Sequence, residues 1–183
     1  MNKEIEVKIE LTKKEFNSLV KNFTNPDLEK TYGYFKDDFS NIKEGIFPRI
    51  KTITGENNKI LFAVKRKVED NDNFFEREEL EVTVQEEKES VEMLRLMLKS
   101  LGFTKEIIFE KKRKNIVKKD IVISYDHLPF GYFVEFEGAP KIIEQYLKEY
   151  KLTKKPRITK AYLALWYDYK EKNNISKDNC EFN

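Results

Sequence analysis

The feature that most constrains the fold of this chain is a set of segments in which charged and apolar residues alternate. Within each segment, neighbouring charges on one face tend to have the same sign. Side chains of a β-strand point to alternate faces, so each such segment has one apolar and one charged face. Several charged faces carry pairs of one sign, namely Glu79 with Glu81, Glu135 with Glu137, Arg49 with Lys51, Lys65 with Lys67, and Lys111 with Arg113. For any one segment, a half-buried strand with its charges in water is the simpler interpretation. Surface strands usually mix signs, however, so the whole set favours a closed barrel with helices on its apolar outside and charges lining its interior.

Two kinds of periodicity divide the chain into expected strands and helices. Strands are expected over about 3–10, 31–36, 46–53, 59–68, 75–84, 105–113, 117–125 and 131–137. Thr12 and Glu15 form a capping-box pattern before a helix over about 13–23, and further helices begin at Pro140 and after Thr159. A helix over about 87–100 has one buried side, made of Val91, Leu94, Leu98 and Leu101. Many strands with few helices between them favour an antiparallel α+β fold over a parallel sheet.

Composition limits the functions open to the chain. Its 183 residues are typical of one domain, and 35 basic against 33 acidic residues give a net charge of +2. A chain this close to neutral has no general attraction to nucleic acid or to a membrane surface. One cysteine and one histidine argue against a disulfide framework, a zinc site and a His-dependent triad. No segment approaches the roughly 20 apolar residues of a membrane span, so we expect a cytoplasmic protein with one domain over 1–170 and a polar, disordered tail over 171–183.

A charged interior needs ligands that neutralise it. Acidic pairs need a cation and basic pairs need a polyanion, because like charges removed from water repel each other and lose hydration. Mg²⁺ commonly binds through one or two carboxylates together with the phosphates of a substrate. Arginine grips phosphate oxygens with a planar fork, and lysine adds a point charge. The pattern therefore predicts a metal-dependent enzyme that acts on a chain of phosphates.

The charged motifs also follow one another in a recognisable order. The chain begins with an ExExK run, Glu4-Ile5-Glu6-Val7-Lys8, and continues with Phe47 to Lys51, Phe62 to Lys65, Arg77 to Glu81, Lys111 to Arg113, and Asp126 with Gly131 to Glu137. This ordered set, over about residues 1–167, resembles the CYTH superfamily, also called triphosphate tunnel metalloenzymes. One departure is Pro48, which cannot donate a ladder hydrogen bond and predicts a bulge or an irregular strand at that point.

The resemblance implies an eight-stranded antiparallel β-barrel tunnel that uses Mg²⁺ or Mn²⁺. It implies metal ligation, direct or through water, by Glu4, Glu6, Asp126, Glu135 and Glu137. It implies phosphate binding by Lys8, Arg49, Lys51, Lys65, Arg77, Lys111, Arg113 and Lys160. The catalytic candidates are Glu79, Glu81 and Lys8, with one of the two carboxylates orienting or deprotonating the attacking water. The alternatives are that Glu79 and Glu81 only position the basic residues, and that Lys160 is an ordinary surface lysine.

Three functions remain open at this point. The first is hydrolysis of a triphosphate-bearing small molecule: inorganic triphosphate, thiamine triphosphate or a nucleoside triphosphate. The second is a class IV adenylyl cyclase, in which the ribose 3′-hydroxyl of ATP attacks the α-phosphate and pyrophosphate leaves. The third is a non-catalytic binder of polyphosphate or of 5′-triphosphate ends, such as an RNA end, and a homodimer is compatible with any of the three. We expect the hydrolase, because the sequence has no evident adenine pocket.

Overall fold

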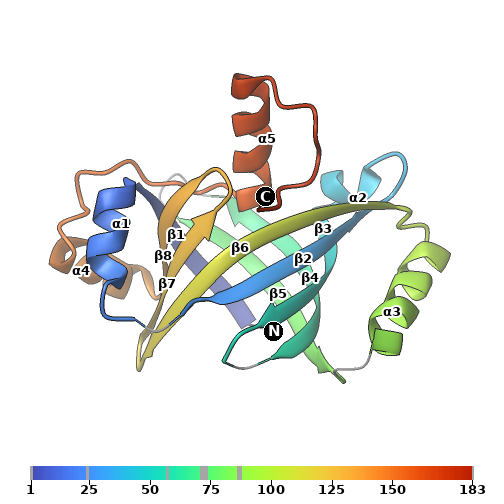
Figure 1. Cartoon of the computed structure of the whole chain (residues 1–183), viewed down its shortest axis with the longest axis horizontal. Helices are drawn as coiled ribbons and strands as arrows, with labels where there is room; N and C mark the ends of the chain where they lie inside the picture. Colours follow the sequence, from blue (N-terminus) through green and yellow to red (C-terminus); the bar gives the residue numbers. More distant parts are fainter. Residues whose placement is uncertain (1, 24, 57, 71–73, 86–87, 183) are drawn as a thin grey trace.

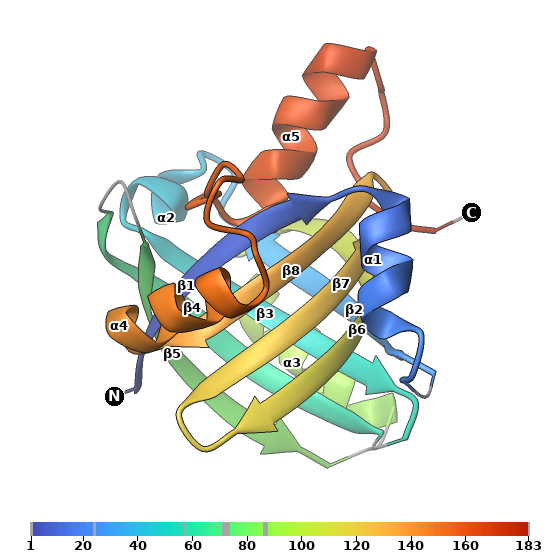
Figure 2. The same ribbon diagram turned by 90° about the vertical axis from the view of Figure 1, so that its left-hand side faces the viewer.

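The strands form one closed antiparallel barrel in the computed structural model, which describes residues 2–23, 25–56, 58–70, 74–85 and 88–182 (Figures 1 and 2). Within those residues the strands neighbour one another in the order β1-β5-β4-β3-β2-β6-β7-β8. Their bounds are β1 (Asn2–Leu11), β2 (Asp27–Phe35), β3 (Ile46–Thr54), β4 (Lys59–Asp70), β5 (Phe75–Val84), β6 (Lys105–Lys118), β7 (Ile121–Leu128) and β8 (Gly131–Gly138). The predicted α+β fold with an eight-stranded antiparallel barrel is confirmed.

The helices lie outside the barrel wall (Figure 2). They are α1 (Lys13–Val20), α2 (Ser40–Lys43), α3 (Lys88–Ser100), α4 (Pro140–Glu149) and α5 (Tyr162–Asn173). The capping box before α1 is present: the backbone N–H of Glu15 donates to the hydroxyl of Thr12 over 3.2 Å, and the carboxylate of Glu15 accepts from the backbone N–H of Thr12 over 2.7 Å. No described helix is both long and apolar enough to cross a membrane.

Helix α2 was not expected, because a single turn has no apolar periodicity. The buried side chain of Asn41 holds this turn in place. Its Oδ1 accepts from the backbone N–H of Lys36 over 3.0 Å, and its Nδ2 donates to the carbonyl of Ile46 over 2.9 Å. The segment between β2 and β3 is thereby fixed at the end of the barrel where α5 also lies (Figures 1 and 2).

The hydrophobic core lies outside the lumen, between the barrel wall and the helices. Val7 and Ile9 on the outer face of β1 are fully buried, and Ile143 and Leu147 of α4 belong to the same cluster. Helix α1 adds Phe16 to this cluster. The charged side chains of β1 face the other way, into the barrel. This inside-out arrangement is the one that the alternation of β1 predicts.

Helix α3 ends differently from the prediction. Its Leu98 packs in a second cluster against β2 and β3, as expected. Leu101, expected on the same buried side, is 70% exposed. The chain turns at Gly102, whose φ of 87° suits glycine, and Phe103 packs against the cluster in place of Leu101.

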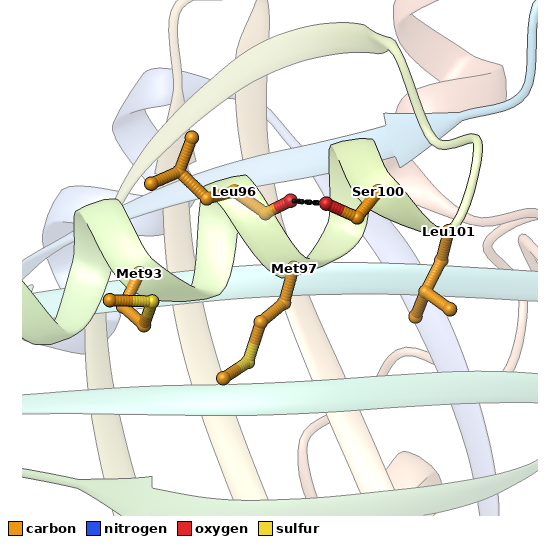
Figure 3. Close-up of a pocket in the computed structure, with 5 residues that line it drawn as sticks. All are labelled: Met93, Leu96, Met97, Ser100 and Leu101. Carbon is orange, nitrogen blue, oxygen red and sulfur yellow. Dashed lines mark hydrogen bonds between the residues drawn. The ribbon is translucent and has the colours of Figure 1, made fainter.

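Helix α3 also presents an apolar patch to solvent (Figure 3). A shallow pocket on this face is lined by Met93, Leu96, Met97, Ser100 and Leu101. These side chains include no charged group that could hold a metal or a phosphate. The chemistry of the chain therefore has to be sought inside the barrel.

The segment after α5 folds back onto β6. Cys180 is fully buried, its backbone N–H donates to the carbonyl of Ile108 over 2.9 Å, and its carbonyl accepts from Glu110 over 2.7 Å. The indole N–H of Trp166 donates to the carbonyl of Asp178 over 2.6 Å. The prediction of a disordered tail is therefore wrong for the described residues up to 182, because backbone hydrogen bonds fix a segment whose composition is polar.

Strand β3 is regular at Pro48, where a bulge was expected. Its register with β4 runs without a shift from Ile46 opposite Arg66 to Ile53 opposite Lys59. The ladder that β3 forms with β2 ends at Arg49, one residue after the proline. No partner in β2 therefore needs the N–H that Pro48 lacks.

Candidate active site

One cavity of about 1310 Å³ occupies the lumen. Side chains of β1 to β6, β8 and α5 line it. The predicted site residues that line it are Glu4, Glu6, Lys8, Arg49, Lys51, Lys65, Arg77, Glu79, Glu81, Lys111, Arg113, Glu135 and Glu137. The strand alternation thus brings into one space residues that are far apart in the sequence.

The wall made by β3, β4 and β5 sets two acidic residues against three basic ones. Glu79 is opposite Lys65 in the register of β4 and β5, and its carboxylate contacts both Lys65, at 3.3 Å, and Arg49. Glu81 contacts the Nζ of Lys51 at 3.0 Å. The runs of one sign along each strand are therefore complementary across neighbouring strands. Glu79 is the more enclosed carboxylate, with 9% of its side chain exposed against 35% for Glu81.

The opposite wall is organised around Arg113. Its guanidinium donates to both carboxylate oxygens of Asp126, over 2.6 and 2.5 Å, and to Glu135 over 3.1 Å. Tyr162 of α5 donates its hydroxyl to Asp126 over 2.7 Å. Asp126 is fully buried, so its two oxygens are occupied by neighbours within the protein. It orients Arg113 and does not join the cavity-lining carboxylates, unlike the metal ligand that the resemblance implied.

Three carboxylates are close enough to share one cation. Glu6, Glu135 and Glu137 each offer an oxygen within 4.8 Å of the other two. The carboxylate of Glu137 has no hydrogen bond or salt bridge among the described residues, and burial, followed by repulsion from Glu135 and Glu6, raises its pKa. An all-oxygen donor set with excess negative charge fits Mg²⁺ or Mn²⁺. Glu4 lies outside this group and contacts the Nζ of Lys65 at 2.9 Å.

Lys8 lies against the same carboxylates from the inner face of β1. Its Nζ contacts Glu6 and lies 3.5 Å from Glu135, and its side chain is 2% exposed. The ring of Phe75 is 4.8 Å from this Nζ, and the ring of Tyr162 is 5.3 Å away. Lys8 therefore balances part of the acidic charge at the centre of the lumen.

Within the described part of the chain, the basic wall leaves one donor of Arg49 unpaired. The Nε–H of Arg49 is buried and has no hydrogen-bond partner among the described residues. Burial, followed by the charge of Arg49, lowers the pKa of Lys51. A buried donor without an acceptor costs about 1–3 kcal/mol, so this place favours an anion. Burial also raises the pKa of Glu4 to about 7, against the opposing effect of Lys65.

Two residues of the site were missed in the sequence. Glu29 of β2 is buried and contacts the Nζ of Lys111 at 3.0 Å. Although burial opposes its ionisation, Lys111 and Arg113 lower its pKa to about 2. The strand was expected to begin only at Thr31. Had it been extended by two residues, alternation would have placed Glu29 on the same face as Thr31, toward the lumen. Tyr162 lies at the start of the helix expected after Thr159, and nothing in that helical pattern indicates that its hydroxyl donates to Asp126.

Two predicted phosphate-binding residues have other surroundings. Lys160 lies outside the cavity lining, and its exposed Nζ pairs with Asp168 at 2.7 Å. This position favours the alternative, a surface lysine, over a phosphate-binding residue. Arg77 does line the cavity, with its guanidinium 3.6 Å from the centre of the Phe75 ring and donating to the carbonyl of Glu76 over 2.6 Å.

The fold and the site together define a class of protein. In this class, a closed antiparallel barrel encloses a cluster of carboxylates that could hold a metal ion, together with a set of basic side chains. The chain belongs to the CYTH domain family, whose model matches residues 2–161. No curated protein matches the sequence.

Solved structures are similar in fold. The PH1819 protein of Pyrococcus horikoshii OT3 has a TM-score of 0.73 at 23% identity, over 91% of this chain and 99% of that one. A candidate adenylate cyclase from Vibrio parahaemolyticus has a TM-score of 0.66 at 16% identity, over 90% and 97% of the two chains. HpAC1 from Hippeastrum, a candidate adenylyl cyclase described as revealing a dominant triphosphatase activity, has a TM-score of 0.63 at 12% identity, over 92% and 96%. At these identities the likeness shows the fold.

Proposed function

We propose that this protein is a divalent-metal-dependent hydrolase of triphosphate-bearing substrates. The observation that carries the proposal is the pairing, inside one cavity, of a carboxylate cluster with a wall of basic side chains. The cluster is Glu6, Glu135 and Glu137, and the basic side chains are Lys8, Arg49, Lys51, Lys65, Lys111 and Arg113. A ligand that carries several phosphates together with a cation neutralises both sets at once.

The basic residues provide for phosphate binding on both sides of the lumen. Arg49 and Lys65 are held by Glu79 on one wall, and Lys111 is held by Glu29 on the other. These acids keep the long basic side chains in place before the substrate arrives, which lowers the entropy cost of binding it. Charge that develops on the phosphate oxygens during transfer then meets donors that are already oriented.

The carboxylate cluster is the part of the site that would hold the metal. Glu6, Glu135 and Glu137 would bind it, directly or through water. A bound Mg²⁺ or Mn²⁺ supplies charge neutralisation on the phosphates and lowers the pKa of bound water. In the absence of other cations, Lys8 reduces the repulsion within the cluster.

Of the two carboxylates on β5, Glu81 is better suited to accept a proton from the attacking water. Glu79 is enclosed by Arg49 and Lys65, which together lower its pKa despite burial and keep it ionised as their anchor. Glu81 is more open and has one basic contact, Lys51. A base needs access to the water that it deprotonates, and Glu81 has that access.

The proposal is tested by a panel of substrates. Inorganic triphosphate, thiamine triphosphate and ATP are each incubated with Mg²⁺ or Mn²⁺, and phosphate, pyrophosphate and cyclic AMP are measured. We expect phosphate as the main product, with turnover abolished by EDTA and restored by excess metal. Turnover undiminished by exhaustive chelation would contradict the metal assignment. Cyclic AMP with equal amounts of pyrophosphate would instead support a cyclase, and saturable binding without turnover would support a non-catalytic binder.

A further inference from the structure

Helix α5 begins at one end of the barrel (Figures 1 and 2), and its first residue, Tyr162, is buried and lines the cavity. The backbone just before the helix is fixed to β1. The N–H of Lys8 donates to the carbonyl of Ile158 over 3.1 Å, and the N–H of Ile158 donates to the carbonyl of Lys8 over 2.9 Å. The match to the CYTH family ends at residue 161, so it gives no role to this tyrosine.

The ring of Tyr162 lies beside two lysines of the lumen. The Nζ of Lys8 is 5.3 Å from the centre of this ring, and the Nζ of Lys111 is 5.7 Å from it. A cation within about 6 Å of the centre of an aromatic ring is attracted to the ring. Lys8 belongs to β1 and Lys111 to β6, and β7 and β8 separate these two strands in the barrel. One side chain of α5 thus contacts basic groups from distant parts of the wall.

The hydroxyl of Tyr162 acts on a third basic group through a carboxylate. It donates to Asp126 over 2.7 Å, and Asp126 accepts two further hydrogen bonds from Arg113. Asp126 is fully buried, so protein donors have to satisfy its oxygens in place of water. Because the hydroxyl supplies one of these donors, Asp126 neutralises less of the positive charge of Arg113. More of that charge is then available to a ligand in the cavity.

The surroundings of Tyr162 hold its side chain in one orientation. Its ring is 5.3 Å from that of Phe133, edge to face, and 6.4 Å from that of Phe109, with which it stacks. One turn later in α5, the indole N–H of Trp166 donates to the carbonyl of Asp178, in the segment that pairs with β6. Long basic side chains lose much rotamer entropy when they are ordered. A fixed ring and hydroxyl that order them beforehand lower the cost of binding a ligand.

We propose that Tyr162 is a positioning residue of the active site, which holds three basic groups of the lumen in place for the phosphates of the substrate. The hydroxyl acts on Arg113 through Asp126. The ring acts directly on Lys8 and Lys111. This inference rests on the proposed function, since it takes the ligand of these three groups to be a chain of phosphates.

The test separates the hydroxyl from the ring in the full chain. Tyr162→Phe removes the hydroxyl alone, and Tyr162→Leu removes the ring as well. The matched control is Tyr34→Phe. The hydroxyl of Tyr34 also donates to a carboxylate, that of Glu106, over 2.6 Å, but Tyr34 packs beneath α3 in the cluster outside the lumen.

Two measurements are made well below the melting temperature of each variant. Titration calorimetry in EDTA, where turnover is prevented, gives the affinity for inorganic triphosphate. Phosphate release with Mg²⁺ gives kcat and KM for the same ligand. Thermal melting checks that each variant is folded, and Tyr162→Phe decides the test alone if Tyr162→Leu is not.

We expect Tyr162→Phe to weaken triphosphate binding and to raise KM by about 5- to 20-fold. This is at the lower end of the range for a lost hydrogen bond to a charged group, because the effect passes through Asp126. Tyr162→Leu should weaken binding by a further factor of about 3 to 30, since two cation–π contacts are also lost. Tyr34→Phe should melt at a lower temperature than the wild type but bind triphosphate within about twofold of it.

A double-mutant cycle with Asp126→Asn checks the route of the effect. In that background the hydroxyl no longer meets a charge, so its removal should change the affinity by less than about twofold. An equal effect in both backgrounds would overturn the proposal, as would wild-type affinity and KM in Tyr162→Phe or equal weakening by Tyr34→Phe. If the binding contrast holds but the wild type hydrolyses no triphosphate with metal, the hydrolase proposal fails and the positioning role stands. No binding of triphosphate by the wild type would overturn both.

Discussion

Two substitutions on opposite faces of the barrel wall separate the roles of its lumen and its core. Ile9→Ala truncates a fully buried side chain on the outer face of β1. An Ile-to-Ala change of this kind costs about 2–5 kcal/mol through lost burial and the cavity left behind. In a chain of this size each kcal/mol shifts the melting temperature by about 2–4 °C, so a decrease of about 4–20 °C is expected. Activity measured well below the melting temperature should be nearly unchanged, because Ile9 faces away from the cavity.

Glu137→Gln should have the opposite effect. Its carboxylate has no hydrogen-bond or salt-bridge partner among the described residues, and its charge is repelled by Glu135 and Glu6. Removing that charge without changing the volume should leave the melting temperature of the metal-free protein within about 2 °C of the wild type, or raise it. Loss of a group that stabilises the metal–phosphate transition state should lower turnover on the order of 100-fold.

Both variants are measured by thermal melting in EDTA and by phosphate release with Mg²⁺. The reasoning is refuted if Glu137→Gln retains full activity or melts many degrees lower than the wild type. It is also refuted if Ile9→Ala loses turnover without losing stability. In either case the assignment of charges to a working lumen and of apolar residues to a structural exterior would be wrong.

Four further changes have definite expected outcomes. Glu29→Gln should lower the free energy of unfolding by about 1–3 kcal/mol at pH 7. This difference from the wild type should disappear as the pH falls from 4.5 to about 2, because the stabilising carboxylate becomes protonated. Urea unfolding at several pH values in this range measures the difference. Tyr162→Phe removes the hydroxyl that donates to Asp126 and should cost about 1.5–3 kcal/mol in the same assay. Thr12→Ala removes the cap of α1 and should cost about 1 kcal/mol, with unchanged turnover. Lys160→Ala should leave turnover and KM within about twofold of the wild-type values. A large rise in KM would instead show that Lys160 binds the substrate's phosphates.

Alternation alone predicted which side chains enter the lumen, because a strand has only two faces. That was enough to place Glu4, Glu6 and Lys8 together and to expect Ile9 outside. Which acid contacts which base could not be predicted in the same way. The contact of Arg49 with Glu79 depends on β3, β4 and β5 lying side by side in one register, and closure of β1 onto β5 and β8 sets the rest.

One contact between an acid and a base could in principle have been predicted from the sequence. Arg113 lies opposite Asp126 because β6 and β7 form a hairpin that turns between Lys118 and Ile121. The strands expected over 105–113 and 117–125 placed the turn at about 114–116, so they could not show this pairing, and only the resemblance suggested a role for Asp126. An error of a few residues at a strand end thus concealed the partner of a fully buried residue.

The closure of the barrel also has a consequence for how the chain is made. Strand β1 pairs with β8, and about 120 residues separate Leu11 from Gly131. At about 5–20 residues per second, a ribosome needs roughly 6–24 s to synthesise the stretch between them. During that time β1 lacks β8, and Val7 and Ile9 lack the α4 side chains that bury them. A nascent chain that stalls before β8 therefore exposes the unpaired backbone edge of β1 and the apolar side chains of its outer face. Surfaces of this kind bind chaperones and promote aggregation.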